Sequence, residues 1–144
     1  MFKLVSYSLK SEWRKGLTRE AKNECVSQRI RHLSLLNKFG VKLGTSLFAI
    51  NEKNLNIINK LNGTYIVGVA DNNIVKNALH IQIEKLKSLV NFELNSNLND
   101  RKLKRLIEEL RTKEMDLAEL ENRKPDLSLI IELEERRMER KKDD

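Results

Sequence analysis

The stretch Tyr65-Ile66-Val67-Gly68-Val69-Ala70 is the most apolar run of this 144-residue chain, and it decides the predicted fold. A short apolar run of this kind predicts a strand buried on both faces. Residues 45–50 predict another strand, and residues 2–9, where apolar and polar side chains alternate, predict a first one. Between these two, apolar residues recur at helical spacing over residues 18–39, and Gly40 supplies a C-terminal stop. Strands that alternate with helices predict an α/β fold.

The segments on either side of the apolar run extend this pattern. Residues 55–61 have helical spacing, which favours a short helix, although Asn62-Gly63 is also typical of a hairpin turn. Asp71 can cap the next helix. Residues 90–95 alternate strictly and predict a fourth strand, although the preceding helix could also continue through them. We therefore expect residues 1–97 to form a small sheet of about four strands with packing helices.

The remaining region, residues 98–144, is predicted to form two C-terminal helices. Asn99 and Asp100 cap a helix that reaches about residue 123, and Pro125 separates it from a second helix that ends near residue 141. The two helices form a hairpin or a coiled-coil-like rod, either packed on the rest of the chain or paired with a second copy. The positions predicted to hold a homo-oligomer together are Leu103, Leu106, Leu110, Leu117 and Leu120, and Lys113 interrupts one of their two rows.

The formal charge of +7 is concentrated at the N-terminus. Residues 1–50 carry ten basic and three acidic side chains, whereas residues 51–100 carry five of each and residues 101–144 thirteen of each. An unbalanced cluster attracts anions, while balanced charge pairs with itself. A single cysteine excludes an internal disulfide, and no apolar run approaches the 18–20 residues of a membrane span. With no export signal, these features favour a cytoplasmic protein.

The N-terminal cations and the single tryptophan form a candidate nucleic-acid site, because cations bind phosphate and an exposed indole stacks on bases. The residues of this site are Lys10, Trp13, Arg14, Lys15, Arg19, Lys22, Arg29 and Arg31. In the alternative interpretation, the tryptophan fills the core and the basic side chains lie along apolar surface. The leading hypothesis is a non-enzymatic protein that binds DNA or RNA and self-associates through its C-terminal helices. The alternative is an inhibitor or adaptor whose basic half binds an acidic protein.

Motifs for catalysis are weak in this sequence. The segment Gly40–Ser46 lacks the Gly-Lys-Ser/Thr core of a phosphate-binding loop, and Cys25 and His32 lie two helical turns apart, too far to share a zinc ion directly. We therefore predict neither a cofactor nor a metal site. A third hypothesis places a metal-dependent phosphodiesterase at Asp71, which follows the most apolar strand, with Glu20, Glu24 or Glu93 as possible partners.

Overall fold

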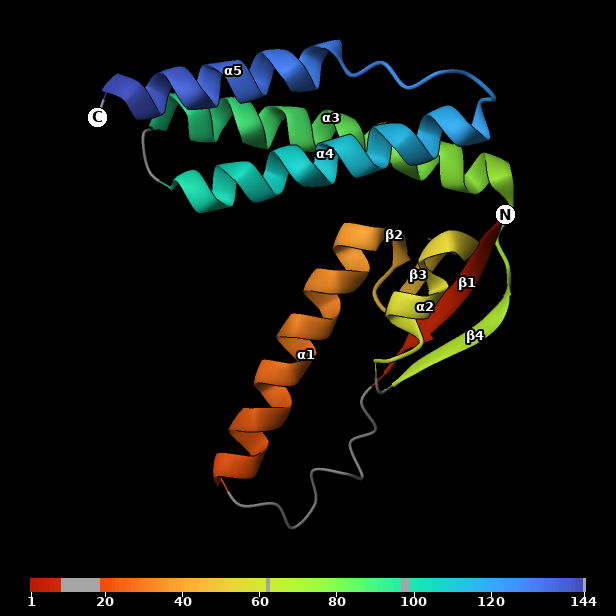
Figure 1. Ribbon diagram of the computed structural model, residues 1–144. Coiled ribbons are helices and arrows are strands. Elements are labelled where there is room, and N and C mark those ends of the chain that lie inside the picture. Colours follow the sequence, from red (N-terminus) through yellow and green to blue (C-terminus); the bar gives the residue numbers. More distant parts are fainter. Residues whose placement is uncertain (9–18, 62, 97–98, 144) are drawn as a thin grey trace. The chain divides into compact units, whose positions relative to one another are not determined.

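The computed structural model describes residues 1–8, 19–61, 63–96 and 99–143, with side chains for these residues except 20–25 and 141–143 (Figure 1). The chain forms two compact units, Met1–Val75 and Lys76–Asp144. The sequence predicts a boundary near residue 97 instead. The boundary lies earlier because α3 (Asn72–Ser96) is one long helix. It begins at the end of the first unit, and most of it belongs to the same unit as the C-terminal helices.

The first unit is built on a four-stranded antiparallel sheet, which confirms the predicted α/β fold with packing helices. Along the chain, its strands and helices are β1 (Phe2–Tyr7), α1 (Arg19–Phe39), β2 (Gly40–Gly44), β3 (Leu47–Asn51), the 3-10 turn η2 (Glu52–Asn54), α2 (Leu55–Ile58) and β4 (Thr64–Val69). The strands lie in the order β2-β3-β1-β4. This order, with β-α-β-β-α-β connectivity, is the ferredoxin-like split βαβ arrangement.

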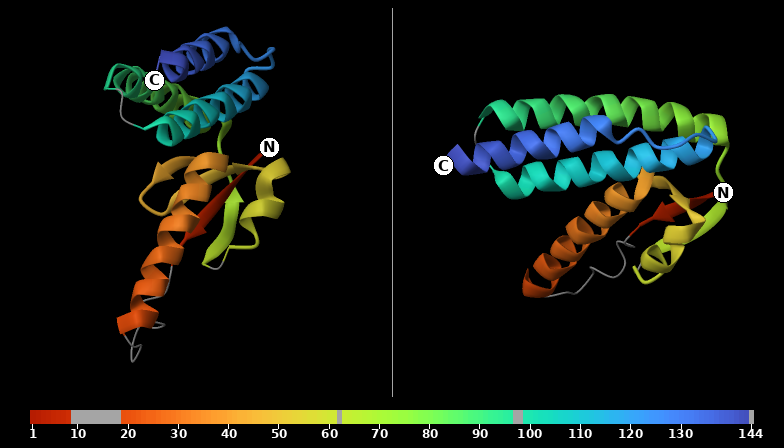
Figure 2. Two further views of the ribbon diagram at one scale, coloured as in Figure 1. Left: turned by 60° about the vertical axis from the view of Figure 1, so that its left-hand side comes forward. Right: turned by 45° about the horizontal axis from the view of Figure 1, so that its top comes forward.

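The two helices of this unit pack on one face of the sheet, where the apolar core lies (Figure 2). Leu36 from α1 and Ile58 from α2 are fully buried there, and they meet Val5 and Tyr7 of β1 together with Phe48 of β3. Alternation along each strand places every second side chain on this face. The sheet and its two helices are therefore held together by a single apolar layer.

Helix α1 is longer than the sheet that it covers. Its 21 residues span about 32 Å, whereas strands of five or six residues span about 17–20 Å. The N-terminal half of α1 consequently runs past the ends of the strands (Figures 1 and 2). Val26 and Ile30 lie on this half and are more than half exposed.

Strand β4 is an exposed edge strand, so the prediction that residues 65–70 are buried on both faces is wrong. The side chains of Tyr65, Ile66, Val67 and Val69 are between 49% and 59% exposed. Two features explain this exposure. The strand has a neighbour, β1, on one side only, and the helix that precedes it, α2, has a single turn. The prediction of a short helix before Gly63, in contrast, is confirmed.

Strand β2 was not predicted, because Gly40 was interpreted only as the stop of the preceding helix. The residue does end α1, but it also begins a strand that pairs with β3 through a tight turn. A side chain at Gly40 would lie 2.3 Å from Ile50 Cδ1 and 2.8 Å from the Leu36 carbonyl oxygen. The glycine therefore lets the end of α1 approach the sheet closely.

Three helices form the second unit: α3 from Lys76 onward, α4 (Asp100–Leu120) and α5 (Ser128–Asp143). They lie side by side, and α4 and α5 form a hairpin, as one of the two predicted arrangements requires (Figure 2). Residues 90–95 belong to α3, so the predicted fourth strand is wrong there. Val90 and Glu93 are buried and Phe92 is exposed, which is the spacing of a helix and not of a strand.

Several charged side chains stabilise the ends of this helical unit. Arg137 of α5 binds the Asp100 carboxylate at 3.1 Å and Glu134 at 3.0 Å. Lys102 of α4 lies 2.9 Å from Glu93 of α3. At the opposite end, Arg123 Nη1 donates to Glu114 Oε1 at 2.7 Å, and Asp126 N donates to the same oxygen at 3.1 Å. These hydrogen bonds hold the loop around Pro125, where the sequence predicts a break between the two C-terminal helices.

Candidate nucleic-acid interface

The structure describes part of the predicted nucleic-acid site. Lys10, Trp13, Arg14 and Lys15 lie outside the described residues, and so does the side chain of Lys22. The other three cations, Arg19, Arg29 and Arg31, all lie on α1. Arg19 and Arg31 are exposed, whereas Arg29 is half-buried. Helix α1 is therefore the element that presents the described part of the predicted site.

The half-buried Arg29 lies close enough to Tyr7 of β1 for its charge to act on the Tyr7 hydroxyl. The Tyr7 hydroxyl bonds to His32 Nδ1 at 3.0 Å, and the two rings meet edge to face with centroids 5.7 Å apart. Burial raises the pKa of Tyr7, and the positive charge of Arg29 partly opposes this rise. Burial also lowers the pKa of His32, and Arg31 lowers it further. The neutral Tyr7–His32 pair thus anchors the cation-bearing segment of α1 to the central strand.

The division of the chain into units coincides with the division of its charge. Residues 1–75 carry twelve basic and five acidic side chains, a net charge of +7, and residues 76–144 carry sixteen of each. Two of the five acidic side chains are described and engaged within their own unit. Glu52 pairs with Lys3 at 3.6 Å, and Asp71 caps α3. The excess positive charge therefore belongs to the sheet-containing unit alone.

The described arginines of the predicted site lie on α1, toward one edge of the sheet, whereas the exposed Lys53 and Lys60 lie around α2. Helix α1 packs on β2 and β3, and β2 itself presents the exposed Lys42. Strand β4 forms the opposite edge and has no charged residue. The sequence does not predict Lys42 as a site residue, because Lys42 lies in a strand that the sequence does not predict. The α1/β2 side, as we call Arg19, Arg29, Arg31 and Lys42 with their backbone, is thus basic.

The central strands offer no aromatic platform for stacked bases. Phe2 and Tyr7 of β1 and Phe48 of β3 are each at most 1% exposed. RNA-binding domains built on a similar sheet stack bases on exposed aromatic residues of the sheet. Among the described residues of β1 and β3, no aromatic ring is available for this role, whereas the edge strand β4 exposes Tyr65.

The leucines predicted to join two copies lie in the interior of a single chain. Leu103, Leu106, Leu110 and Leu117 are at most 6% exposed, and Leu120 is half-buried. They fill the space between the helices of the second unit. A second copy would have to open this unit in order to reach them.

Asp71 acts as a helix cap. Its Oδ1 accepts bonds from the backbone N–H groups of Asn73 at 2.9 Å and Ile74 at 3.2 Å. Of its suggested partners, Glu93 binds Lys102, and the side chains of Glu20 and Glu24 lie outside the description. The described part of the chain contains no group of three His, Cys, Asp or Glu residues arranged to hold a metal ion.

Comparisons with known proteins add no relative to this description, since no family model, curated protein or solved structure matches the chain. Among the helices of the described residues, none has the length and apolar character needed to cross a membrane.

Proposed function

We propose that this protein binds the phosphate backbone of nucleic acids through the α1/β2 side of its N-terminal unit. The observation that carries the proposal is the confinement of the whole +7 charge to residues 1–75, in which exposed arginines share one helix. A cluster of this kind binds polyanions with little sequence preference, because phosphate contacts carry no base information.

The test is the salt dependence of binding to a fluorescein-labelled 20-base-pair DNA duplex, followed by fluorescence anisotropy from 50 to 300 mM NaCl. The variant Arg19→Ala/Arg31→Ala removes two exposed cations of α1. If both contact phosphates, the slope of log K against log salt becomes shallower by about 1.8. The control Arg105→Ala/Lys104→Ala removes two exposed cations of α4 in the neutral unit and should leave the slope unchanged.

Two results contradict the proposal. One is affinity that is negligible at 50 mM NaCl or does not decrease as salt increases. The other is an equal response of the α1 variant and the α4 control. Repeating the titration with single-stranded DNA and RNA of the same length identifies the preferred polymer.

A second candidate function is the binding of an acidic protein by the same helix. The exposed Val26 and Ile30 favour it, because apolar side chains beside Arg31 suit a protein interface better than a phosphate backbone. The variant Ile30→Ser distinguishes the two functions. If it retains full nucleic-acid affinity but no longer recovers an acidic partner from nuclease-treated lysate, the protein interaction is supported.

A further inference from the structure

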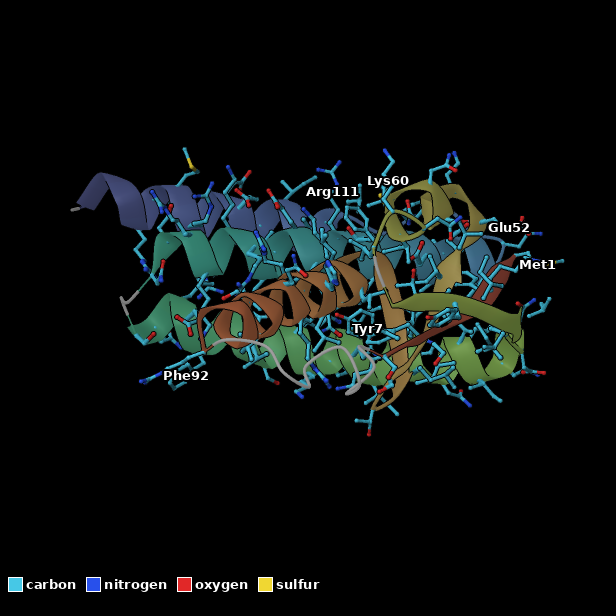
Figure 3. The ribbon with its side chains drawn as sticks, turned by 90° about the horizontal axis from the view of Figure 1, so that it is seen from below. Met1, Tyr7, Glu52, Lys60, Phe92 and Arg111 are labelled. Carbon is cyan, nitrogen blue, oxygen red and sulfur yellow. The ribbon has the colours of Figure 1, made fainter. Side chains whose placement is uncertain are left out.

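Helix α3 carries an exposed apolar stripe along almost its whole length. The stripe contains Ile81, Phe92 and Ile74, which are 70%, 64% and 58% exposed, and Leu89 at its margin, which is 38% exposed. In Figure 3, the labelled Phe92 side chain points away from the ribbon of its own helix. Ile81 and Phe92 are among the most exposed large apolar side chains in the described part of the molecule.

The stripe lies on the side of α3 away from its buried face. The buried side chains of this helix are Val75, Leu79, Ile83, Leu86 and Val90. At 100° per residue, the centre of that face is about 140° from the line that joins Ile74, Ile81 and Phe92. Helix α3 is therefore apolar on two separate faces, of which only one contributes to the core of the chain.

The spacing of the stripe is that of a helix that packs against another helix. Positions 74, 78, 81, 85, 88 and 92 alternate steps of four and three residues, and each of them is exposed or half-buried. They hold Ile, Ala, Ile, Lys, Ser and Phe in that order. Alternating steps of four and three keep one row of side chains facing a partner helix over about 27 Å.

We propose that this stripe pairs with the same stripe of a second copy, with the two α3 helices antiparallel. In this arrangement Phe92 of one copy packs on Ile74 of the other, and Ala78 meets Ser88, so that small residues face each other. Ile81 packs on the aliphatic stem of Lys85, whose ammonium group then lies beside Glu84 of the second copy. A two-fold axis at the level of residue 83 generates each of these contacts twice.

Charge favours a second copy in this orientation over a parallel one. A parallel pair would place the two Lys85 side chains in the same layer of the interface, where like charges repel. The antiparallel pair separates them by about one helical turn and gives each a carboxylate, because Glu84 flanks the stripe. Glu84 also lies 3.2 Å from Lys87 of its own chain, so a carboxylate is already held at this position.

The area of the stripe indicates a weak dimer. If a large apolar side chain has about 150–200 Å² of surface, the stripe exposes roughly 400 Å² per copy. A standard stable interface buries about 800 Å² per partner. We therefore expect a dissociation constant in the micromolar range, and a dimer that coexists with monomer. This inference does not depend on nucleic-acid binding, but a dimer would place two basic units in one particle.

The first test is sedimentation velocity of the full chain from 1 to 200 µM. The mass of the wild type should increase toward twice 16.8 kDa as concentration increases. Ile81→Lys should weaken association at least tenfold, because it places a second ammonium group against Lys85 of the other copy. The matched control is Ile131→Lys on α5, where the isoleucine is also exposed, at 57%, and should not change the mass. Far-ultraviolet circular dichroism establishes that both variants fold.

The second test identifies the orientation by disulfide crosslinking in a Cys25→Ser background. The double variant Ala78→Cys/Ser88→Cys should form covalent dimers on oxidation, whereas neither single variant should do so. Efficient crosslinking of either single variant would show a parallel pair and overturn the proposed orientation. A wild type that remains monomeric at 200 µM, or a dimer that Ile81→Lys leaves intact, would overturn the interface itself.

Discussion

Lys113 offers the sharpest quantitative test of this structure. Its side chain is 3% exposed within the helical unit, and burial lowers its pKa from 10.5 to about 8. Glu109 and Asp116 oppose the change without cancelling it. A difference of this size corresponds to about 3 kcal/mol between the charged and neutral forms. Below pH 8, Lys113 is therefore mostly charged in the folded protein, and its burial lowers the free energy of unfolding.

The stability of the protein should consequently increase with pH. Between pH 8 and 10.5 the folded state has lost the Lys113 proton while the unfolded chain still holds it, so the free energy of unfolding increases. From pH 7 to pH 9.5 the expected increase is about 2 kcal/mol. Tyr7 does not interfere in this range. Because its pKa is raised, Tyr7 stabilises the folded state while its hydroxyl is protonated, and that contribution is lost only above about pH 10.

Urea unfolding followed by circular dichroism at several pH values measures this effect. An increase of 2 kcal/mol shifts the midpoint by about 1 M urea in a protein of this size. The variant Lys113→Met should lose the pH dependence, whatever its stability at pH 7. Lys104→Met, which replaces an exposed lysine of the same helix, should keep it. A flat wild-type profile, or an equal slope in Lys113→Met, would refute the assignment of the effect to this burial.

Three further predictions concern the local structure of single residues. His32 has a lowered pKa in the folded state, so the free energy of unfolding of the wild type should decrease as pH falls from 7 to 5. In urea titrations, His32→Gln should show a shallower decrease, and equal slopes for the two proteins would contradict this. Gly40→Ala should lower stability by about 1–3 kcal/mol in thermal unfolding, because the new methyl group meets Ile50 and backbone. Gly44→Ala, where a methyl group meets nothing closer than 3.8 Å, should cost less, and a similar loss in both variants would argue against the close approach. Asn99→Ala should cost about 1 kcal/mol through the loss of its cap bonds at 3.1 and 3.3 Å, whereas Asn99→Asp should retain most of the stability.

The sequence predicts the long helices well because their apolar residues keep a helical period over many turns. The predicted helix over residues 18–39 corresponds to α1, and Asn99 caps α4 as expected. Residues 90–95 were predicted wrongly because six residues are too few to distinguish a period of two from one of 3.6. The buried Val90 and Glu93 continue the helical series of Ile83 and Leu86, which a longer window would have included.

Exposure is harder to predict than secondary structure, because it depends on which elements become neighbours. The run of residues 65–70 is apolar, but its position at the edge of the sheet follows from the strand order and the single turn of α2. The spacing of Leu103 and its row fits packing within one chain as well as an interface between copies, and the structure buries most of the row within one chain. The seven-residue spacing of Ile74, Ile81 and Ser88 is visible in the sequence. It does not lead to a predicted helix face, because a strand is predicted for the residues that follow.

The charge of the candidate site was predicted more completely than its geometry. Counting residues places the whole excess of +7 at the N-terminus, and the structure assigns that excess to one compact unit. The count does not reveal that Arg29 is half-buried and acts electrostatically on Tyr7, while Arg31 is exposed. That distinction follows from the side of α1 that packs on the sheet.

The central position of β1 has a consequence for how the chain reaches its native state. Residues 2–7 are synthesised before their hydrogen-bonding partners, which lie in residues 47–51 and 64–69. The sheet cannot close until residue 69 has been made, and such distant pairings form slowly. The α4–α5 hairpin, in contrast, joins neighbouring segments and can form quickly. Folding should therefore show two kinetic phases, with the slower one assigned to closure of the sheet.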